Sequence, residues 1–465
     1  MRITCWILTL TVAAPPLVLA QAPLPADILI RNAHLVTMNE EKAVIVGGTL
    51  VIHRSEIIAV GGPELTESYA AGKVIDAGGD IVMPGMVNTH THAPMTLFRG
   101  LADEVPDRLE RFIFPLERTV VDSENVYRGT LLAAVEMVQG GVTTFADMYY
   151  FEDQVARAAA EVGMRAIAGE TVIQYPAPDA KEPYGGLEYA KKFIEAFRGH
   201  ELITPALAPH APYSVGEEQL ALVAEWAEKL DVPILIHLSE TKAEIEQIRR
   251  DFGKTPVEYL DSVGLLNARL VAAHCIFVTE SDIDLLKRRG VGVSHNMVSN
   301  VKAGKGVAPV LTMLDRGVDV GLGTDGAMSG NTLDIITQMG YVAKIHKLVH
   351  EDRTVMPPVD VVEMATIGGA RALDMGDRIG SLEVGKLADV VIVDKDAVNM
   401  IPMYDVYSAL VYAASPANVT TTIIHGRIIM EERKVLTVDV DKIWQDVLEL
   451  NEAIKKEAEK LARGN

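Results

Sequence analysis

The chain has 465 residues, of which 49% are apolar and 23% are charged, and its formal net charge is −21. This length is enough for a large core and more than one domain. The acidic balance excludes nucleic acid as a partner, because a polyanion requires a basic surface. We therefore expect the binding partner to be a small molecule, either neutral or cationic.

Residues 1–20 resemble a secretory signal peptide. Arg2 precedes an apolar run over residues 3–20 that ends in small residues. An uncleaved membrane anchor is the alternative, but two prolines within the run and its borderline length argue against it. We predict that the segment is cleaved, that the protein is exported to the periplasm or beyond, and that the mature chain does not associate with a membrane. Since Cys5 would leave with the signal, Cys275 cannot form an internal disulfide.

Residues 25–82 are predicted to form a small β-sheet domain. Short strand-like pieces alternate there with turn residues such as Asn39, Gly47 and Gly61. No helical periodicity interrupts them. We expect these strands to need a further part of the chain to complete their sheet.

Residues 83–375 alternate between strand-like and helical segments. Eight alternating units of this total length predict an α/β protein built on a (β/α)₈ TIM barrel. The first predicted strand begins just before this segment. The eight strand-like runs lie at residues 81–90, 143–149, 165–172, 203–210, 233–238, 270–275, 291–295 and 318–325.

Strands return in residues 376–436, which we expect to join residues 25–82 in one discontinuous β-sandwich domain beside the barrel. Residues 437–465 are predicted to form a C-terminal helix, because apolar residues recur there at helical spacing. Its apolar face leaves two alternatives, packing on the same chain or contact between the subunits of a homo-oligomer. The apolar positions are Ile443, Val447, Leu450 and Ile454.

Metal-binding side chains lie at the ends of several predicted barrel strands. His90 and His92 are two residues apart and therefore face the same side of the first strand. His237 closes the fifth strand and Asp325 closes the eighth, although a buried histidine and a turn aspartate are the structural alternatives. Since the carboxyl ends of barrel strands meet at one face, we predict that these four side chains form an open zinc site.

Other polar residues near the strand ends are candidates for catalysis. Glu240 follows His237 by three positions, so its carboxylate can move protons beside the metal. From spacing alone, His210, His274 and His295 remain open between functional and core roles. Cys275 is predicted to be a small core residue rather than a nucleophile.

Seven motifs together resemble the amidohydrolase superfamily, and within it the group of 5-methylthioadenosine/S-adenosylhomocysteine deaminases and the related triazine hydrolases. The resemblance covers essentially the whole chain after the signal segment. The motifs are PGMVNTHTH at 84–92, LFRGLAD at 97–103, APHAPY at 208–213, HLSET at 237–241, AHC at 273–275, SHN at 294–296 and GTDG at 323–326.

The resemblance implies one divalent metal ion, usually zinc and in some members iron. Its ligands would be His90, His92, His237 and Asp325. The predicted fourth strand, residues 203–210, has no lysine, so the bridging carbamate of two-metal relatives has no source. The cysteine-based zinc signature of the other nucleobase deaminases is also absent from the sequence.

The resemblance also implies roles in the reaction. Glu240 would protonate a ring nitrogen of the substrate, Asp325 would take a proton from water, and His274 would orient that water. Glu117 falls where nucleoside deaminases of the group hold the ribose, and His210 falls at another substrate contact. The implied catalytic residues are thus Glu240, His274 and Asp325, and the implied substrate-binding residues are Glu117, His210 and Glu240.

The chain departs from the group's pattern at two positions. Two arginines of adenosine-derivative deaminases align near Glu170 and Gly186, where this chain has neither. The metal chemistry does not depend on those positions, whereas recognition of the substrate's tail does.

We therefore predict a metal-dependent hydrolytic deaminase of an amino-substituted N-heterocycle, either a purine nucleoside such as an adenosine derivative or a nucleobase. One alternative keeps the site but cleaves another C–N or C–Cl bond, as a triazine dechlorinase, aminohydrolase or amidase would. A second alternative is a binding barrel without catalysis.

Overall fold

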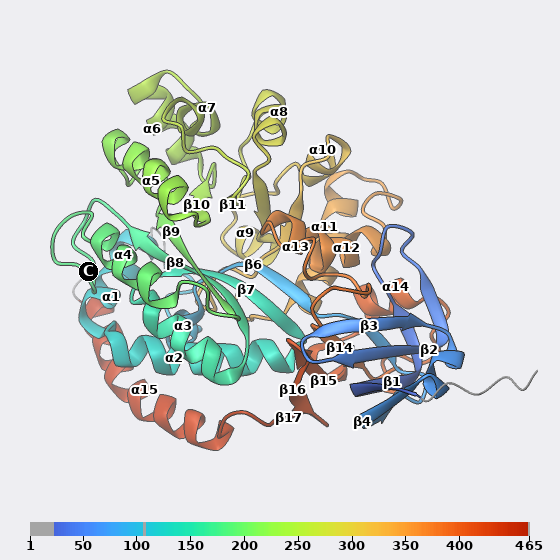
Figure 1. Cartoon of the computed structure of the whole chain (residues 1–465). Coiled ribbons are helices and arrows are strands. Elements are labelled where there is room, and N and C mark those ends of the chain that lie inside the picture. The colour runs from blue at the N-terminus through green and yellow to red at the C-terminus, as the bar shows by residue number, and fades with distance from the viewer. Residues whose placement is uncertain (1–22, 106–107, 464–465) are drawn as a thin grey trace, which may run out of the picture.

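The computed structural model describes residues 23–105 and 108–463. The predicted signal peptide lies outside these residues. Within them the strands form two sheets, one of eight and one of nine strands, and Figure 1 shows the two sheets side by side with most helices around the first. None of the helices in this part of the chain has the length and apolar character needed to cross a membrane.

The eight-stranded sheet is parallel and its strands follow chain order, which confirms the predicted fold class. Almost every strand residue is buried, as expected for a sheet covered on both faces. The backbone amides of Thr324 and Asp325 donate to the carbonyl oxygen of His90, at 3.1 and 3.0 Å, and so bring the last strand's end against the first strand. The strands are β6 (Met86–Thr91), β7 (Val142–Tyr149), β8 (Arg165–Val172), β9 (Ile203–Pro209), β10 (Ile234–Leu238), β11 (Leu270–His274), β12 (Gly292–His295) and β13 (Val320–Leu322).

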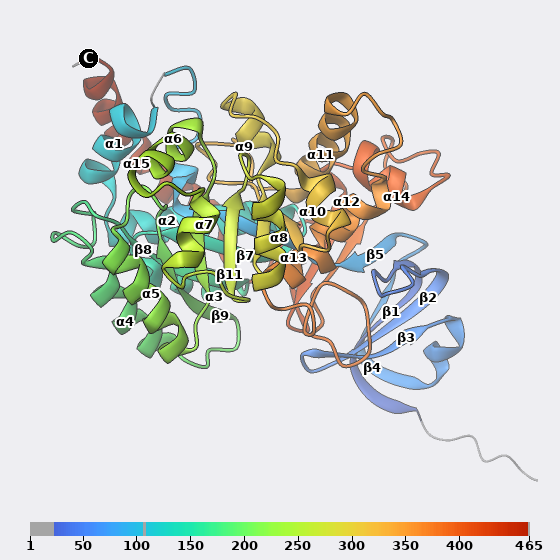
Figure 2. The same ribbon diagram turned by 90° about the horizontal axis from the view of Figure 1, so that it is seen from above.

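Helices follow the barrel strands and surround them, as the view from above in Figure 2 shows. Side-chain caps explain several of their starts: Asp122 caps α2, and Thr255 and Thr279 form capping boxes at α7 and α8. The helices are α1 (Phe114–Val120), α2 (Ser123–Gln139), α3 (Glu152–Val162), α4 (Gly186–Phe197), α5 (Glu217–Leu230), α6 (Lys242–Phe252), α7 (Pro256–Ser262), α8 (Glu280–Arg289), α9 (Met297–Lys302), α10 (Val310–Asp315), α11 (Ile335–Val349), α12 (Pro358–Ala365) and α13 (Ile367–Ala372).

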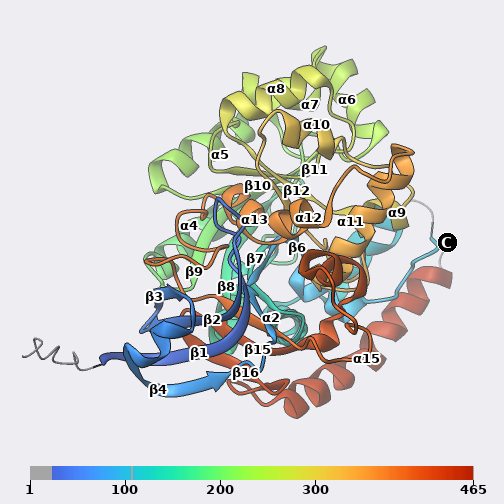
Figure 3. The same ribbon diagram turned by 90° about the vertical axis from the view of Figure 1, so that its right-hand side faces the viewer.

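The nine-stranded mixed sheet combines both ends of the chain, as predicted. Strand β5 pairs with β1 on one side and β14 on the other, which joins the two halves. Figure 3 shows β1 and β2 beside the C-terminal strands. The strands are β1 (Leu24–Val36), β2 (Val44–His53), β3 (Glu56–Gly61), β4 (Tyr69–Asp76), β5 (Ile81–Pro84), β14 (Val390–Val393), β15 (Val419–Ile424), β16 (Arg427–Glu431) and β17 (Lys434–Val435).

The prediction of one strand over residues 81–90 is wrong, because the chain changes sheets at Gly85. The amide of Gly85 donates to the carbonyl of Asp389 beside the mixed sheet, whereas the next amide, of Met86, donates to Gly141 beside the barrel. A Cβ atom at Gly85 would lie 2.1 Å from the hydroxyl of Thr143. Only glycine therefore allows the close approach at which β5 ends and β6 begins.

A buried ion pair connects the barrel to the mixed sheet. Arg165 in β8 donates from Nε and Nη2 to the two carboxylate oxygens of Asp389, each at 3.1 Å, and both side chains are 2% exposed. The bidentate geometry satisfies both partners in a site that excludes water. The barrel is thus held at a fixed position against the second sheet.

The C-terminal helix α15 (Val440–Arg463) packs against α1 and α2 of the same chain. Ile443, Ile454 and Ala458 are buried in that contact, whereas Trp444 and Leu448 are exposed. Packing on the same chain, the first of the two predicted alternatives, accounts for the apolar face. The helix also covers α1, which carries Glu117.

Candidate active site

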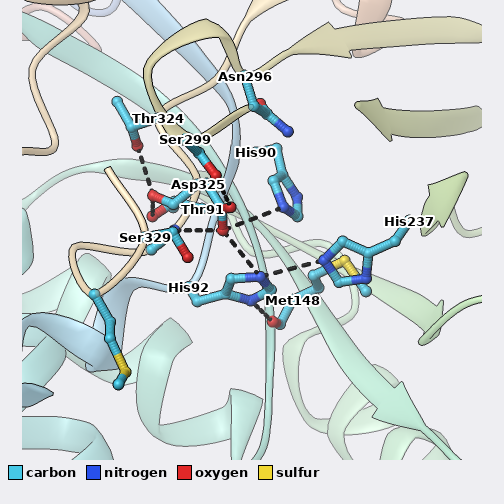
Figure 4. A network of polar contacts seen from close by, with 12 residues as sticks. His90, Thr91, His92, Met148, His237, Asn296, Ser299, Thr324, Asp325 and Ser329 are labelled. Atoms are coloured by element: carbon cyan, nitrogen blue, oxygen red, sulfur yellow. Dashed lines mark hydrogen bonds and ion pairs between the residues drawn. The ribbon is translucent and has the colours of Figure 1, made fainter. Parts of the chain in front are cut away.

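Four of the predicted metal-binding side chains meet at the carboxyl end of the barrel, and Figure 4 shows them converging. The Nε2 atoms of His92 and His237 are 3.3 Å apart. One carboxylate oxygen of Asp325 lies 3.4 Å from His92 Nε2 and 3.9 Å from His90 Nε2. Strand ends separated by more than two hundred residues thus bring four donor groups to one point.

Backbone carbonyls fix the orientation of two of these imidazoles. The Nδ1 of His92 lies 2.6 Å from the carbonyl oxygen of Met148, and the Nδ1 of His237 lies 2.8 Å from that of His210. A carbonyl can only accept, so each Nδ1 carries the hydrogen. The two Nε2 atoms therefore present lone pairs to each other.

These residues fit a divalent cation. Two lone pairs that face each other at 3.3 Å repel unless a cation lies between them, and among the described residues His90 Nε2 has no hydrogen-bond partner either. Two nitrogen ligands of a tetrahedral zinc ion, each about 2.0–2.1 Å from the metal, lie roughly 3.3 Å apart. The donor spacing matches that requirement.

The protonation states also suit a metal. Burial and neighbouring imidazoles hold the pKa values of His90 and His237 well below the ordinary histidine value, so both rings are neutral. Burial raises the pKa of Asp325, but the neighbouring His92, His274 and His90 outweigh it and lower the pKa below the usual aspartate range. Neutral imidazoles and an ionised carboxylate are the forms that bind metal.

The short helix α9 supports the site from behind. Ser299 Oγ donates to Asp325 Oδ2 at 2.5 Å, and His274 Nδ1 lies 2.8 Å from Asn300 Oδ1. The second ring nitrogen of His274 is 3.6 Å from Glu240 Oε1. The sequence analysis did not predict α9; the SHN motif just before it was the only signal for this region.

Glu240 lies beside these donors on the loop after β10. The amides of Ser239 and Glu240 donate to the carboxylate of Glu244, at 2.7 and 2.8 Å, which fixes the backbone that carries Glu240. Its side chain contacts His274 and the ammonium of Lys305. Burial raises the pKa of Glu240, but His274 and Lys305 outweigh it and lower the pKa to about 2.

A small cavity of about 10 Å³ lies between α1 and the segment 173–178. Glu117 is buried in its wall and accepts a hydrogen bond from Tyr149 at 2.7 Å, and burial raises the pKa of Glu117 to about 7. The wall is otherwise mostly aromatic and apolar, with one exposed cation. The lining residues are Phe114, Glu117, Arg118, Tyr150, Ile173, Tyr175, Pro176 and Pro178.

His210 lies between the cavity and the donors. Its ring centroid is 5.0 Å from that of His237 and 6.2 Å from that of Phe114 in the cavity wall. Its Nδ1 is 2.7 Å from the hydroxyl of Ser214, and burial lowers its pKa to about 4. His210 is thus a neutral ring within reach of a ligand that spans the cavity and the donor cluster.

The two positions at which the chain departs from the pattern that it resembles, near Glu170 and Gly186, do not line this cavity. Glu170 is buried in β8 and accepts the amide of Glu152 at 2.9 Å. A Cβ atom at Gly186 would lie 2.0 Å from the carbonyl oxygen of Thr171, so the start of α4 packs directly on β8. Arg118 is the cation that the lining contains instead.

Two residues lie apart from the donors: His295, whose role the sequence did not decide, and Cys275, which was predicted to be a core residue. His295 is buried and pairs with His346 of α11 at 3.2 Å between Nε2 atoms. Cys275 is fully buried, and burial raises the pKa of its thiol. Neither belongs to the donor cluster of the described residues.

Comparison with known proteins agrees with this arrangement. The Amidohydrolase family model matches residues 81–429. The chain is 45% identical over 433 residues to a 5-methylthioadenosine/S-adenosylhomocysteine deaminase of Syntrophobacter fumaroxidans, covering 92% of this chain and 99% of the relative. It is 42% identical over 430 residues to a 5'-deoxyadenosine deaminase of Methanosarcina barkeri, covering 90% and 96%.

A solved structure is also similar over the full length. The crystal structure of an adenosine deaminase from Xanthomonas campestris with bound zinc superposes with a TM-score of 0.91 at 35% identity. The match covers 93% of this chain and 100% of that protein.

Proposed function

The chain belongs to the amidohydrolase family, and on this basis we propose that it is a metal-dependent hydrolytic deaminase of adenosine-type nucleosides. The observation that carries the proposal is the convergence of three imidazoles and one carboxylate, with Glu240 beside them. The similarity to named deaminases of adenosine derivatives supports the choice of substrate class.

We propose that His90, His92, His237 and Asp325 hold one divalent metal ion, with zinc as the first candidate. Imidazole nitrogen also suits iron, so the donor set does not by itself select the metal. When bound, such an ion lowers the pKa of a coordinated water to about 7 and so supplies a nucleophile at neutral pH. The zinc in the similar Xanthomonas campestris structure supports this choice.

The protein's own side chains would move the protons. Asp325 takes a proton from the attacking water, and His274, held by Asn300, orients that water. Because its low pKa leaves the Glu240 carboxylate ionised, Glu240 takes the second proton of that water and delivers it to the ring nitrogen next to the carbon under attack, which makes that carbon electrophilic. Asp325 passes its proton to the amino group as the C–N bond breaks, so that one water and one amino group give a ring carbonyl and ammonia. General acid–base catalysis of this kind contributes roughly 10²–10⁴ in rate.

The side chains that line the small cavity would contact the rest of the nucleoside. Glu117 is buried deep enough to accept hydrogen bonds from ribose hydroxyls without competition from water. The rings of Phe114 and Tyr150 offer apolar surface to a sugar and its 5' substituent. His210 contacts the same molecule from the donor side.

The experiment that tests this function is a substrate panel with zinc-loaded protein. Adenosine, 5'-deoxyadenosine, methylthioadenosine and S-adenosylhomocysteine are compared with an aminotriazine and a chlorotriazine. We expect ammonia from the adenosine derivatives, together with a product whose mass corresponds to replacement of the amino group by oxygen. Absence of ammonia across the whole panel would overturn the proposal, and release of chloride or alkylamine would identify the alternative hydrolase.

A further inference from the structure

Lys305 contacts the residue to which we assign proton transfer. Its Nζ atom forms an ion pair with Glu240 Oε1, the oxygen that also lies 3.6 Å from His274 Nε2. The side chains of Glu240 and Lys305 are 14% and 29% exposed. The pair is therefore largely shielded from water, where the attraction between opposite charges is strong.

The backbone of the loop between α9 and α10 is built to place this ammonium. Gly304 and Gly306 flank Lys305 with φ angles of +63° and +134°, which side-chain-bearing residues rarely adopt. The amide of Lys305 donates to the carbonyl of Asn300 at 2.9 Å. Asn300 is also the residue that holds His274. One residue thus sets the positions of two groups that contact Glu240.

Lys302, three residues earlier, provides a contrast. Its ammonium lies 2.7 Å from Asp103 and also contacts Asn331, so it joins surface loops. Lys302 at the end of α9 and Lys305 in the loop that follows therefore have different partners, and only Lys305 contacts Glu240. The partners of Lys302 lie outside the donor cluster, whereas the partner of Lys305 is the glutamate beside His274.

We propose that Lys305 is a positioning residue of the reaction, holding the Glu240 carboxylate in the orientation from which it delivers a proton to the substrate ring. The expected effect of Lys305 on kcat rests on the proposed function, whereas the ion pair with Glu240 does not. Without Lys305, His274 Nε2 at 3.6 Å is the side-chain group that remains beside Glu240 Oε1 among the described residues. Glu240 would then turn away from the substrate for part of the time.

The first test does not depend on activity. Lysine acetylation with acetic anhydride is followed by peptide-resolved mass spectrometry in the zinc-loaded wild type and in Glu240→Gln. An ion pair that raises the lysine pKa by one unit lowers the reactive free-amine fraction about tenfold. We expect acetylation of Lys305 to become about tenfold faster in Glu240→Gln while that of Lys302 does not change. Equal rates at Lys305 in both proteins would overturn the proposal.

The second test separates positioning from a merely structural role. We expect Lys305→Met to lower kcat about tenfold with little change in KM. This loss is smaller than the roughly 10²–10⁴-fold that general acid–base catalysis supplies, because Glu240 itself is still present. Lys305→Arg should restore most of kcat because it keeps the charge, and Lys302→Met should match the wild type. Zinc content and the melting temperature of each variant show whether it folds.

The outcomes distinguish the two proposals. If the wild type releases no ammonia from any substrate, the proposed function fails and acetylation alone decides the role of the Lys305–Glu240 pair. If the wild type is active and Lys305→Met retains its kcat, the inference about Lys305 fails and the deaminase proposal stands.

Discussion

The two sides of the site are built differently. The metal-donor side comes from the ends of β6 and β10 and the turn after β13, and backbone carbonyls fix two of its imidazoles at 2.6 and 2.8 Å. The substrate side comes from helix α1, the segment 173–178 and the loop that carries Lys305. Its polar groups are held by side chains, as Tyr149 holds Glu117.

This difference indicates which side of the site tolerates substitution. Strand ends are tied into the barrel ladder, so a change there moves a metal ligand, whereas loops tolerate substitution and carry specificity. The cation in the cavity wall is Arg118 on α1, whereas Glu170 is buried in β8 and Gly186 packs against that strand. We therefore expect substitutions on the substrate side to change substrate choice while metal binding is kept.

The largest effect is expected from loss of a donor on the metal side. His237→Ala should lower the zinc content from about one equivalent to a small fraction of it and abolish turnover, because it removes one of the three imidazole donors and leaves a gap in the coordination shell. Elemental analysis after growth with zinc measures this. His295→Asn is the matched control, since His295 closes another barrel strand, β12, but pairs with His346. Full zinc in His237→Ala would show that the donor assignment is wrong.

Glu240→Gln should separate metal binding from catalysis. The variant keeps the shape of the side chain and all four donors, but it cannot supply a proton. We expect full zinc content and a kcat lowered by roughly 10²–10⁴-fold, the contribution of general acid–base catalysis. Near-normal turnover in this variant would contradict the proton-transfer role.

Ser299→Ala tests the support behind the donors. Its hydroxyl donates to Asp325 at 2.5 Å, and loss of a hydrogen bond to a metal ligand typically costs about 10–100-fold in metal affinity or activity. We therefore expect a chelator to remove zinc from Ser299→Ala at a concentration about 10–100-fold lower than from the wild type. Ser281→Ala on the surface of α8 is the control, and an unchanged chelator titration in Ser299→Ala would indicate that α9 does not stabilise the donor set.

The smallest effect should come from the substrate side. Burial raises the pKa of Glu117 to about 7, so its carboxyl is protonated below that pH and ionised above it. An ionised carboxylate accepts two hydrogen bonds from sugar hydroxyls, and KM should therefore fall as pH rises through 7. Glu117→Gln should raise KM at pH 8 by about tenfold, remove this trend, and leave kcat nearly unchanged. A loss in kcat with unchanged KM would place Glu117 in the chemistry instead.

The sequence predicted the metal side because its signals are local. Alternating strands and helices give the barrel, and a histidine or aspartate at a strand end is visible without knowledge of distant contacts. The sheet change at Gly85 was missed, since it depends on which carbonyl each successive amide meets. Helix α9, Lys305, Glu244 and Arg118 were missed for the same reason: their partners are distant in sequence or lie on irregular loops. The cleavage of residues 1–20, export and the role of each site residue remain predictions.

The most direct test of the central claim is turnover in heavy-oxygen water. Zinc-loaded wild type and Glu240→Gln are incubated with the best adenosine derivative, and ammonia and product mass are measured together. The account predicts that the wild type releases one ammonia per product and that each product molecule carries one heavy oxygen. Glu240→Gln with full zinc should form ammonia and labelled product far more slowly. Product without heavy oxygen, or without ammonia, would contradict hydrolytic deamination at this site.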